Sequence, residues 1–138
     1  MKLIVSLLAA TMLFISNSIL AQENNTITAT VVNVTSNEGK VGFALYTKDN
    51  FMGKPILGDK VAVKDGKSIV VFKNVKPGTY AITCYHDKNG NDKMDFAANG
   101  MPLEDYGASN NNMSFGPPNF EDAKFVVSDK DVSLEIKF

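Results

Sequence analysis

The sequence predicts an all-β domain, an antiparallel Greek-key sandwich of two sheets with about seven strands. Apolar and polar residues alternate with a period of two in several short segments, most clearly around Val41, Phe43 and Leu45. Tight-turn signals such as Asp65-Gly66 separate these segments. No stretch carries the apolar stripe of an amphipathic helix, so we expect strands to supply the core.

The expected strands follow one another with short connections, except near the end of the chain. A long loop over residues 87–119 separates the fifth expected strand from the sixth, and it is the first place to look for function because loops of this length are uncommon in compact domains. The seven expected strands are 27–34, 41–46, 61–64, 68–73, 79–86, 123–127 and 132–138.

The first 21 residues have the pattern of a secretory signal peptide. A basic start at Lys2 precedes a short apolar run, and the small residue Ala21 stands before polar sequence. The apolar run is too short and too broken for a good membrane span. We therefore expect cleavage after about Ala21, a secreted or periplasmic location, no membrane span in the mature chain, and a single domain over residues 22–138.

Composition excludes some partners. The chain has 14 basic residues, all of them lysine, against 15 acidic residues, and the formal net charge is −1. Without arginine or a basic cluster, nucleic acid is not an expected partner. The single cysteine, Cys84, cannot form an intrachain disulfide, and its strand parity predicts a buried position. The single histidine, His86, is expected at the rim of the same face in a structural role.

The start of the long loop predicts a calcium site. Oxygen-bearing side chains recur at alternate positions of a tight loop, which is how hard cations collect their oxygen ligands. Asp92 stands where a calcium loop usually has glycine, and Ala98 stands where its last carboxylate is expected, so Glu104 or Asp105 would have to replace that ligand. A plain Asn/Asp-rich turn is the alternative. The candidate ligands are Asp87, Asn89, Asn91, the carbonyl of Lys93, and Asp95.

The second half of the loop predicts a ligand surface. Amide groups and aromatic rings together are what a carbohydrate-binding surface needs, but asparagine and serine also cap backbone groups in a loop packed on itself. Both interpretations stay open. The candidate residues are Tyr106, Ser109, Asn110, Asn111 and Phe115.

Four blocks of sequence carry a resemblance, at residues 78–82, 85–95, 100–111 and 116–125. In their order and spacing they resemble a family of secreted bacterial proteins that is catalogued only as a domain of unknown function. Asp92 departs from the second glycine that is usual in that family's first loop. Residues 72–80 are similar to the strand-turn-strand of transthyretin-like and carboxypeptidase-regulatory-like sandwiches. That resemblance implies an immunoglobulin-like or transthyretin-like fold and no activity.

These observations favour a non-catalytic module that binds a ligand, such as a carbohydrate, through its long loop and is stabilised by calcium. An accessory envelope protein that docks on a protein partner is the alternative. A weaker alternative is a hydrolase that uses the carboxylate pairs Glu104-Asp105 or Glu121-Asp122. We expect no enzyme, because no activated nucleophile or cofactor motif emerges.

Overall fold

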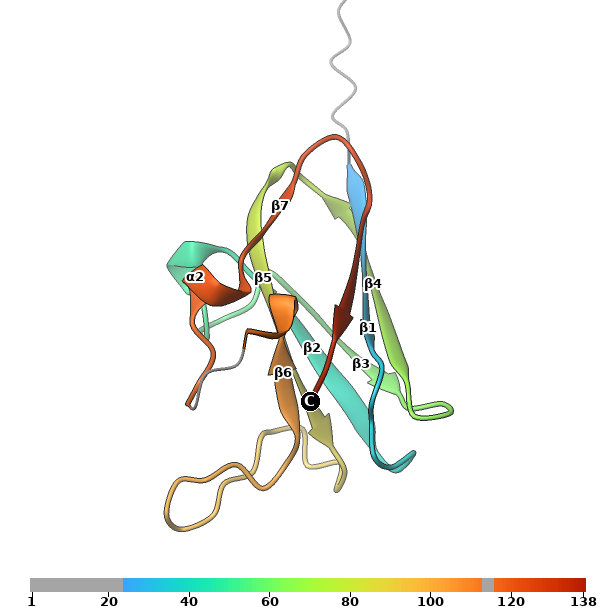
Figure 1. Ribbon diagram of the computed structural model, residues 1–138, viewed down its shortest axis with the longest axis vertical. Helices are drawn as coiled ribbons and strands as arrows, with labels where there is room; N and C mark the ends of the chain where they lie inside the picture. Colours follow the sequence, from blue (N-terminus) through green and yellow to red (C-terminus); the bar gives the residue numbers. More distant parts are fainter. Residues whose placement is uncertain (1–23, 113–115) are drawn as a thin grey trace, which may run out of the picture.

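The computed structural model describes residues 24–112 and 116–138 (Figure 1). The predicted signal peptide and Phe115 lie outside these described residues. The chain forms two sheets that pack face to face, so the predicted all-β sandwich is confirmed. The elements are β1 (Asn25–Val31), β2 (Lys40–Tyr46), η1 (Lys48–Asn50), β3 (Leu57–Ala62), β4 (Ser68–Val75), β5 (Gly78–Asp87), β6 (Tyr106–Ala108), η2 (Ser109–Asn111), α2 (Phe120–Ala123), β7 (Phe125–Val127) and β8 (Val132–Ile136).

The smaller sheet has the strand order β4-β1-β8. In β1, Ile27, Ala29 and Val31 face the core and are fully buried, as their period of two predicts. One pairing departs from the antiparallel prediction, because β1 and β8 run parallel, with Ile27 beside Val132. The reason is that β7 pairs with β5 in the other sheet, so the turn after β7 carries the chain across the sandwich instead of closing a hairpin.

The larger sheet has the order β3-β2-β5-β6, and β7 also pairs with β5. β5 is its longest strand, and its free side is shared, with β7 on the part near Gly78 and β6 on the part near Cys84. The inner face of β5 joins the core through Tyr80, Ile82 and Cys84. Its outer face does not contribute to this core.

A second, small apolar cluster covers part of that outer face. Ala81 of β5 and Ala108 of β6 pack there against Phe120 and Ala123 of α2. The ring of Phe51 packs edge-on against Phe120 with centroids 5.6 Å apart. This cluster anchors the far end of the long loop to the sheet.

Some elements differ from the prediction. The sequence predicts a strand from residue 123, but Ala123 ends α2, whose first turn is capped by the Asn119 side chain accepting from the Asp122 N–H at 2.9 Å. The three-residue strand β6 and the turn η2 lie inside the predicted loop. Both segments are too short to show a period. In the described residues no helix is long and apolar enough to cross a membrane.

The Asp65-Gly66 turn forms as predicted, with φ of 52° and 70° and paired hydrogen bonds between Lys64 and Lys67 of 2.8 and 3.0 Å. Beyond this turn the two strands do not stay together. β3 continues into the larger sheet and β4 into the smaller one. The turn is therefore a corner between the sheets.

Gly39 is the tightest glycine position and gives a test of the fold. Its φ is +68°, and a Cβ there would lie 2.0 Å from the carbonyl oxygen of Asp87. Gly90 has a similar φ of +71°, but a Cβ there would meet nothing within 4 Å. Gly90→Ala should therefore cost only the left-handed penalty of about 1–2 kcal/mol, and Gly39→Ala clearly more, in urea unfolding. Equal losses of unfolding free energy in the two variants would contradict the close approach of the Gly39 turn to Asp87 at the end of β5.

Candidate functional site

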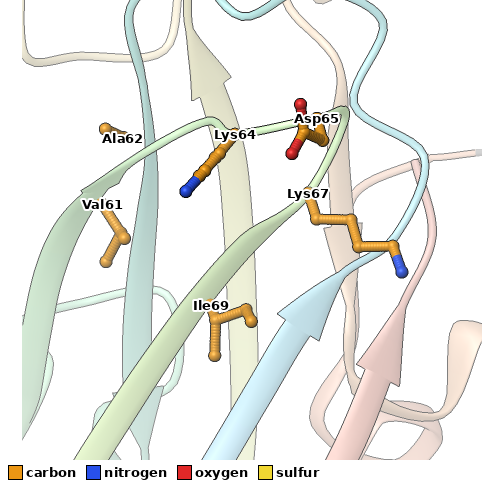
Figure 2. A pocket seen from close by; sticks show the side chains of 6 residues that line it. All are labelled: Val61, Ala62, Lys64, Asp65, Lys67 and Ile69. Atoms are coloured by element: carbon orange, nitrogen blue, oxygen red, sulfur yellow. The ribbon is translucent and has the colours of Figure 1, made fainter.

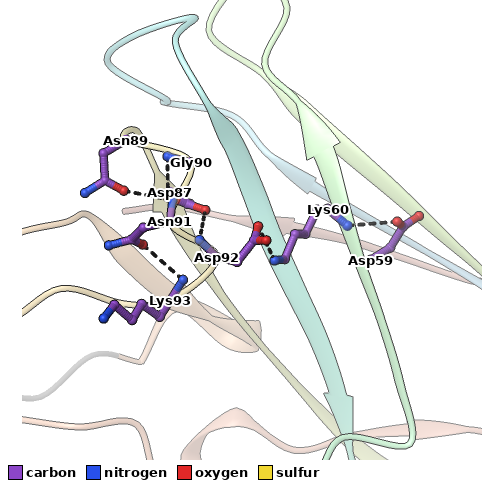
Figure 3. Close-up of polar contacts among 8 residues, drawn as sticks. All are labelled: Asp59, Lys60, Asp87, Asn89, Gly90, Asn91, Asp92 and Lys93. Carbon is purple, nitrogen blue, oxygen red and sulfur yellow. Dashed lines mark hydrogen bonds and ion pairs between the residues drawn. The ribbon is translucent and has the colours of Figure 1, made fainter.

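The loop after β5 is folded around one carboxylate, that of Asp87. One oxygen of Asp87 accepts from the N–H of Gly90 at 2.8 Å and of Asn91 at 3.1 Å, and the other accepts from Asp92 at 2.9 Å (Figure 3). The side chain is buried. Asp92 has a φ of 66°, so aspartate adopts here the left-handed conformation that glycine usually provides. The predicted departure at Asp92 therefore leaves the turn intact.

Three of the five candidate calcium ligands converge on the outer side of this loop. Asn89 donates to Asp95 at 2.6 Å, and Asn91 donates to both oxygens of Asp95 at 2.8 Å. These bonds, from Asn91 first and then Asn89, lower the pKa of the Asp95 carboxyl. Lys93 belongs to the same turn because its N–H donates to Asn91 at 3.1 Å. Asp87 instead directs both its oxygens at backbone N–H groups.

Glu104 is the later carboxylate that reaches the loop. Its two oxygens accept from the N–H of Lys88 and of Asp95, each at 3.2 Å, and the residue is 8% exposed. Asp105 points elsewhere, toward the hydroxyl of Thr35 at 3.3 Å. Of the two carboxylates that could replace the missing last ligand of the calcium loop, Glu104 is therefore the one that lies against the loop.

An ion pair ties the loop to the edge strand β3. The ammonium of Lys60 lies 2.5 Å from the carboxylate of Asp92 (Figure 3). The pair raises the pKa of Lys60 and lowers that of Asp92. Because both groups are exposed, solvent screens the attraction, and the pair orients the loop more than it stabilises the fold.

The charge available for a cation is small. In residues 24–112 and 116–138, no three histidine, cysteine, aspartate or glutamate side chains are grouped so that they could hold a metal ion. A calcium ion at this loop would therefore depend on amide and carbonyl oxygens as well as on Asp95.

The amide-rich segment is used to fasten the loop. Asn110 donates to the carbonyls of Asp122 and Lys124 at 3.0 and 2.8 Å. Asn111 donates to the Glu135 carbonyl at 2.9 Å, and its side-chain oxygen accepts from the N–H of Lys137 at 2.8 Å. These contacts agree with the packed-loop interpretation of the sequence.

Ser109 and Tyr106 differ in their exposure to solvent. Ser109 is 1% exposed, and its hydroxyl contacts the N–H of Ile82 at 3.0 Å and the carbonyl of Ala123. Tyr106 is partly exposed and donates to the Gly116 carbonyl at 3.3 Å. Of the predicted ligand surface, Tyr106 is the described residue that borders an open cavity.

That cavity has a volume of about 720 Å³ and lies between the long loop and the outer face of β5 and β6. The sequence prediction missed it because its walls come from segments far apart in the chain. The outward parity of Tyr85 on β5 was the available signal. Its wall includes Met52, Met94 and Met101, the rings of Tyr85, Phe96 and Tyr106, Pro102, Pro117 and Pro118, and Thr83 and Cys84 of β5.

A small hairpin forms the outer wall of the cavity. The N–H of Leu103 donates to the carbonyl of Asp95 at 2.9 Å, and the N–H of Ala97 donates to the carbonyl of Met101 at 2.8 Å. The hairpin therefore starts at the same Asp95 that the asparagines hold. The calcium candidate and the cavity wall share one residue.

A second cavity of about 520 Å³ lies at the corner between β3 and β4 (Figure 2). It is bordered by Val61 and Ile69 and by the charged side chains of Lys64, Asp65 and Lys67. None of its residues belongs to the long loop. Its charged border makes it a poorer site for an apolar ligand than the cavity over β5.

His86 and Cys84 face inward. The ring of His86 is fully buried, lies 2.7 Å from the Glu38 carbonyl through Nε2, and is stacked on Phe138. Its Nδ1 has no hydrogen-bond partner among the described residues. Cys84 is 3% exposed, and its sulfur lies 3.7 Å from the Gly107 carbonyl.

The carboxylates proposed for hydrolysis have other partners. Glu121 pairs with Lys124 at 2.5 Å and with Lys48 at 3.1 Å, and the Lys124 contact is the larger cause of its lowered pKa. Asp122 contacts the Asn119 amide at 2.5 Å.

The sequence profile of a family described as "Uncharacterized protein conserved in bacteria (DUF2141)" matches residues 29–135. The chain belongs to this family. The match runs from within β1 to within β8, so it includes the long loop and the residues that line the cavity over β5 and β6. The predicted membership of a bacterial family of unknown function is thereby confirmed. No curated protein and no solved structure matches the chain.

Burial raises the pKa of the Cys84 thiol well above its usual range, so the thiolate is suppressed at neutral and mildly alkaline pH. We therefore predict that a thiol reagent labels the native protein far more slowly than the unfolded protein, even at pH 9. The measurement is the labelling rate with and without denaturant. Fast labelling of the folded chain would show that the thiol is open to solvent from the cavity.

Proposed function

We propose that this DUF2141 domain is an exported, non-catalytic binding module that holds an apolar ligand in the cavity over β5 and β6. The observation that carries the proposal is the cavity itself, whose volume of about 720 Å³ lies in the range of small-molecule sites. It sits on a rigid sheet and is walled by the long loop, which is where binding sites are commonly built.

The chemistry of the wall favours an apolar or aromatic ligand over a sugar. Methionine side chains adapt their shape and contact aromatic rings favourably, and three of them meet three aromatic residues here. A sugar would need several free hydrogen-bonding groups. The amides of Asn110 and Asn111, which the sequence offered for that purpose, are bonded to backbone groups.

The wall also supports docking of an apolar segment of an envelope protein as the second candidate. Phe96, Met101 and Leu103 on the hairpin are 58%, 61% and 67% exposed. Exposed apolar side chains that gather on one surface are typical of interaction sites. Export through the sequence at residues 1–21 would place either partner in the periplasm or outside the cell.

The cavity is tested by filling it. Thr83 lies on its floor, and Thr79 lies on the same face of the same strand but outside it. Thr83→Trp should abolish binding of the apolar fluorescent probe anilinonaphthalene sulfonate, and Thr79→Trp should leave it unchanged. Phe96→Ala, at an exposed wall position, should weaken binding without loss of thermal stability.

Unchanged probe binding in Thr83→Trp, with a native melting curve, would remove the cavity as the site. A glycan array with the wild-type protein and with Thr83→Trp tests the sugar hypothesis separately. Specific glycan binding that survives Thr83→Trp would place a sugar site on another surface.

We further propose that calcium binds at Asn89, Asn91 and Asp95, with Glu104 and the carbonyl of Lys93 beside them. The convergence of the two amides on Asp95 supports this proposal. An amide turned by half a rotation presents its oxygen in place of its nitrogen, so the same three side chains can face a cation.

Calcium at roughly 100 times its Kd should add about 2.7 kcal/mol to stability and raise the melting temperature by roughly 10 °C. Asp95→Asn should abolish this increment, because it removes the carboxylate on which both asparagine amides converge. Asp129→Asn, in the turn after β7, is the matched control and should retain it. The measurement is thermal melting in chelator, calcium and magnesium, and magnesium should substitute poorly.

Asp87→Asn separates the loop's own role from that of the ion. Since Asp87 accepts three backbone N–H groups, this variant should lose stability in chelator as well. A melting temperature that does not respond to millimolar calcium in the wild-type protein would leave the loop as a plain Asn/Asp-rich turn.

A further inference from the structure

The methionines of the described residues border one cavity. Residues 24–112 and 116–138 contain three methionines and one cysteine, and all four of these residues line the cavity over β5 and β6. They come from the loop after η1 (Met52), from the position just before the hairpin (Met94), from the hairpin itself (Met101) and from β5 (Cys84). Cys84 turns its thiol toward the core, so the three methionines, from two separate segments of the chain, are the residues that bring sulfur side chains to the cavity.

Packing alone does not account for these methionines. Met52 and Met101 are 54% and 61% exposed, so they bury little surface in the core. Neither methionine joins either of the two apolar clusters of the fold. They border the cavity while about half or more of each residue is exposed. A methionine has three rotatable bonds with which to bring its sulfur to a common point.

We propose that the three thioethers of Met52, Met94 and Met101 form a binding site for a soft monovalent metal ion, Cu(I). Thioether sulfur is a soft ligand that selects Cu(I) over the hard divalent cations, which prefer oxygen. The cavity offers hard cations little, because no carboxylate of residues 24–112 or 116–138 borders it. This inference goes beyond the proposed apolar ligand and does not require one.

The surroundings suit a single positive charge. Tyr85 and Tyr106 lie opposite each other in the β5–β6 register and border the same cavity. Aromatic rings attract cations through their quadrupole, so two tyrosines beside the thioethers favour an ion of charge +1 without an anionic partner.

Cys84 is not part of the ligand set. Its thiol is nearly fully buried, contacts the Gly107 carbonyl, and is kept protonated by its raised pKa. A thioether needs no deprotonation to bind a metal, so the site should work over a wide pH range, unlike one made of thiolates or histidines.

The experiment is a competition for Cu(I) between the purified protein and the coloured chelator bicinchoninate, without oxygen and with ascorbate as reductant. The wild-type protein should withhold one equivalent of Cu(I). The triple variant Met52→Leu, Met94→Leu, Met101→Leu should withhold none, because leucine keeps the apolar volume and removes the sulfur. Cys84→Ala should still withhold one equivalent.

Single variants keep the test valid if the triple variant does not fold. Loss of a group outside the first coordination shell already costs roughly 10- to 100-fold in metal affinity, so Met101→Leu at its exposed position should cost at least as much. Copper withheld equally by the wild-type and leucine variants, lost only in Cys84→Ala, or not withheld at all would overturn the proposal. Probe binding retained in the leucine variants separates this inference from the proposed function, because the two can then fail independently.

Discussion

The buried carboxylate of Asp87 is the constraint on which the functional half of the molecule depends. It ends β5, pairs in register with Lys40 at the start of β2, and closes the following loop by accepting three backbone N–H groups. A buried acceptor of this kind is costly to leave without partners, so the sheet can hold Asp87 there only if the chain turns back immediately. Gly39 closes over the same point, because a Cβ at this position would lie 2.0 Å from the Asp87 carbonyl oxygen. The direction in which the long loop leaves the sandwich is therefore set at the last residue of β5.

The two faces of β5 have different roles, because one packs in the core and the other borders the cavity. Because side chains alternate along a strand, Ile82 and Cys84 serve the core, and Thr83 and Tyr85 serve the cavity. The outer face is closed at one end by the cluster around Phe120 and left open at the other end beneath the hairpin. The long loop is thus fastened at its far end and free to form a wall in between. This arrangement explains why an amide-rich segment is needed, since Asn110 and Asn111 attach that far end to α2 and β8.

The local parts of this structure could be predicted from sequence, and the non-local parts could not. The period of two placed the inner residues of β1, β2 and β5, because each of those strands buries one face in a continuous core. Asp65-Gly66 gave its turn type, because the required positive φ is a property of those two residues. The sequence of this turn did not predict that the strands on its two sides enter different sheets. That outcome depends on which strand lies beside β1, and β8 takes the place by running parallel to it. The strand β6 was missed because three residues show no period.

The candidate site divides in the same way. The spacing of Asn89, Asn91 and Asp95 was enough to bring them together, because alternate residues of a tight turn face one side. The cavity was invisible to such reasoning, since Met52 and Tyr106 meet there only through the fold. The two features nevertheless meet at Asp95. Its side chain is held by the asparagines, its N–H is bonded to Glu104, and its carbonyl starts the hairpin that walls the cavity. An interaction that orders Asp95 therefore also orders the wall, and a ligand that meets an ordered wall loses less conformational entropy on binding. By linkage the reverse also holds, because a ligand that holds the hairpin in place must strengthen whatever binds at Asp95 by the same factor.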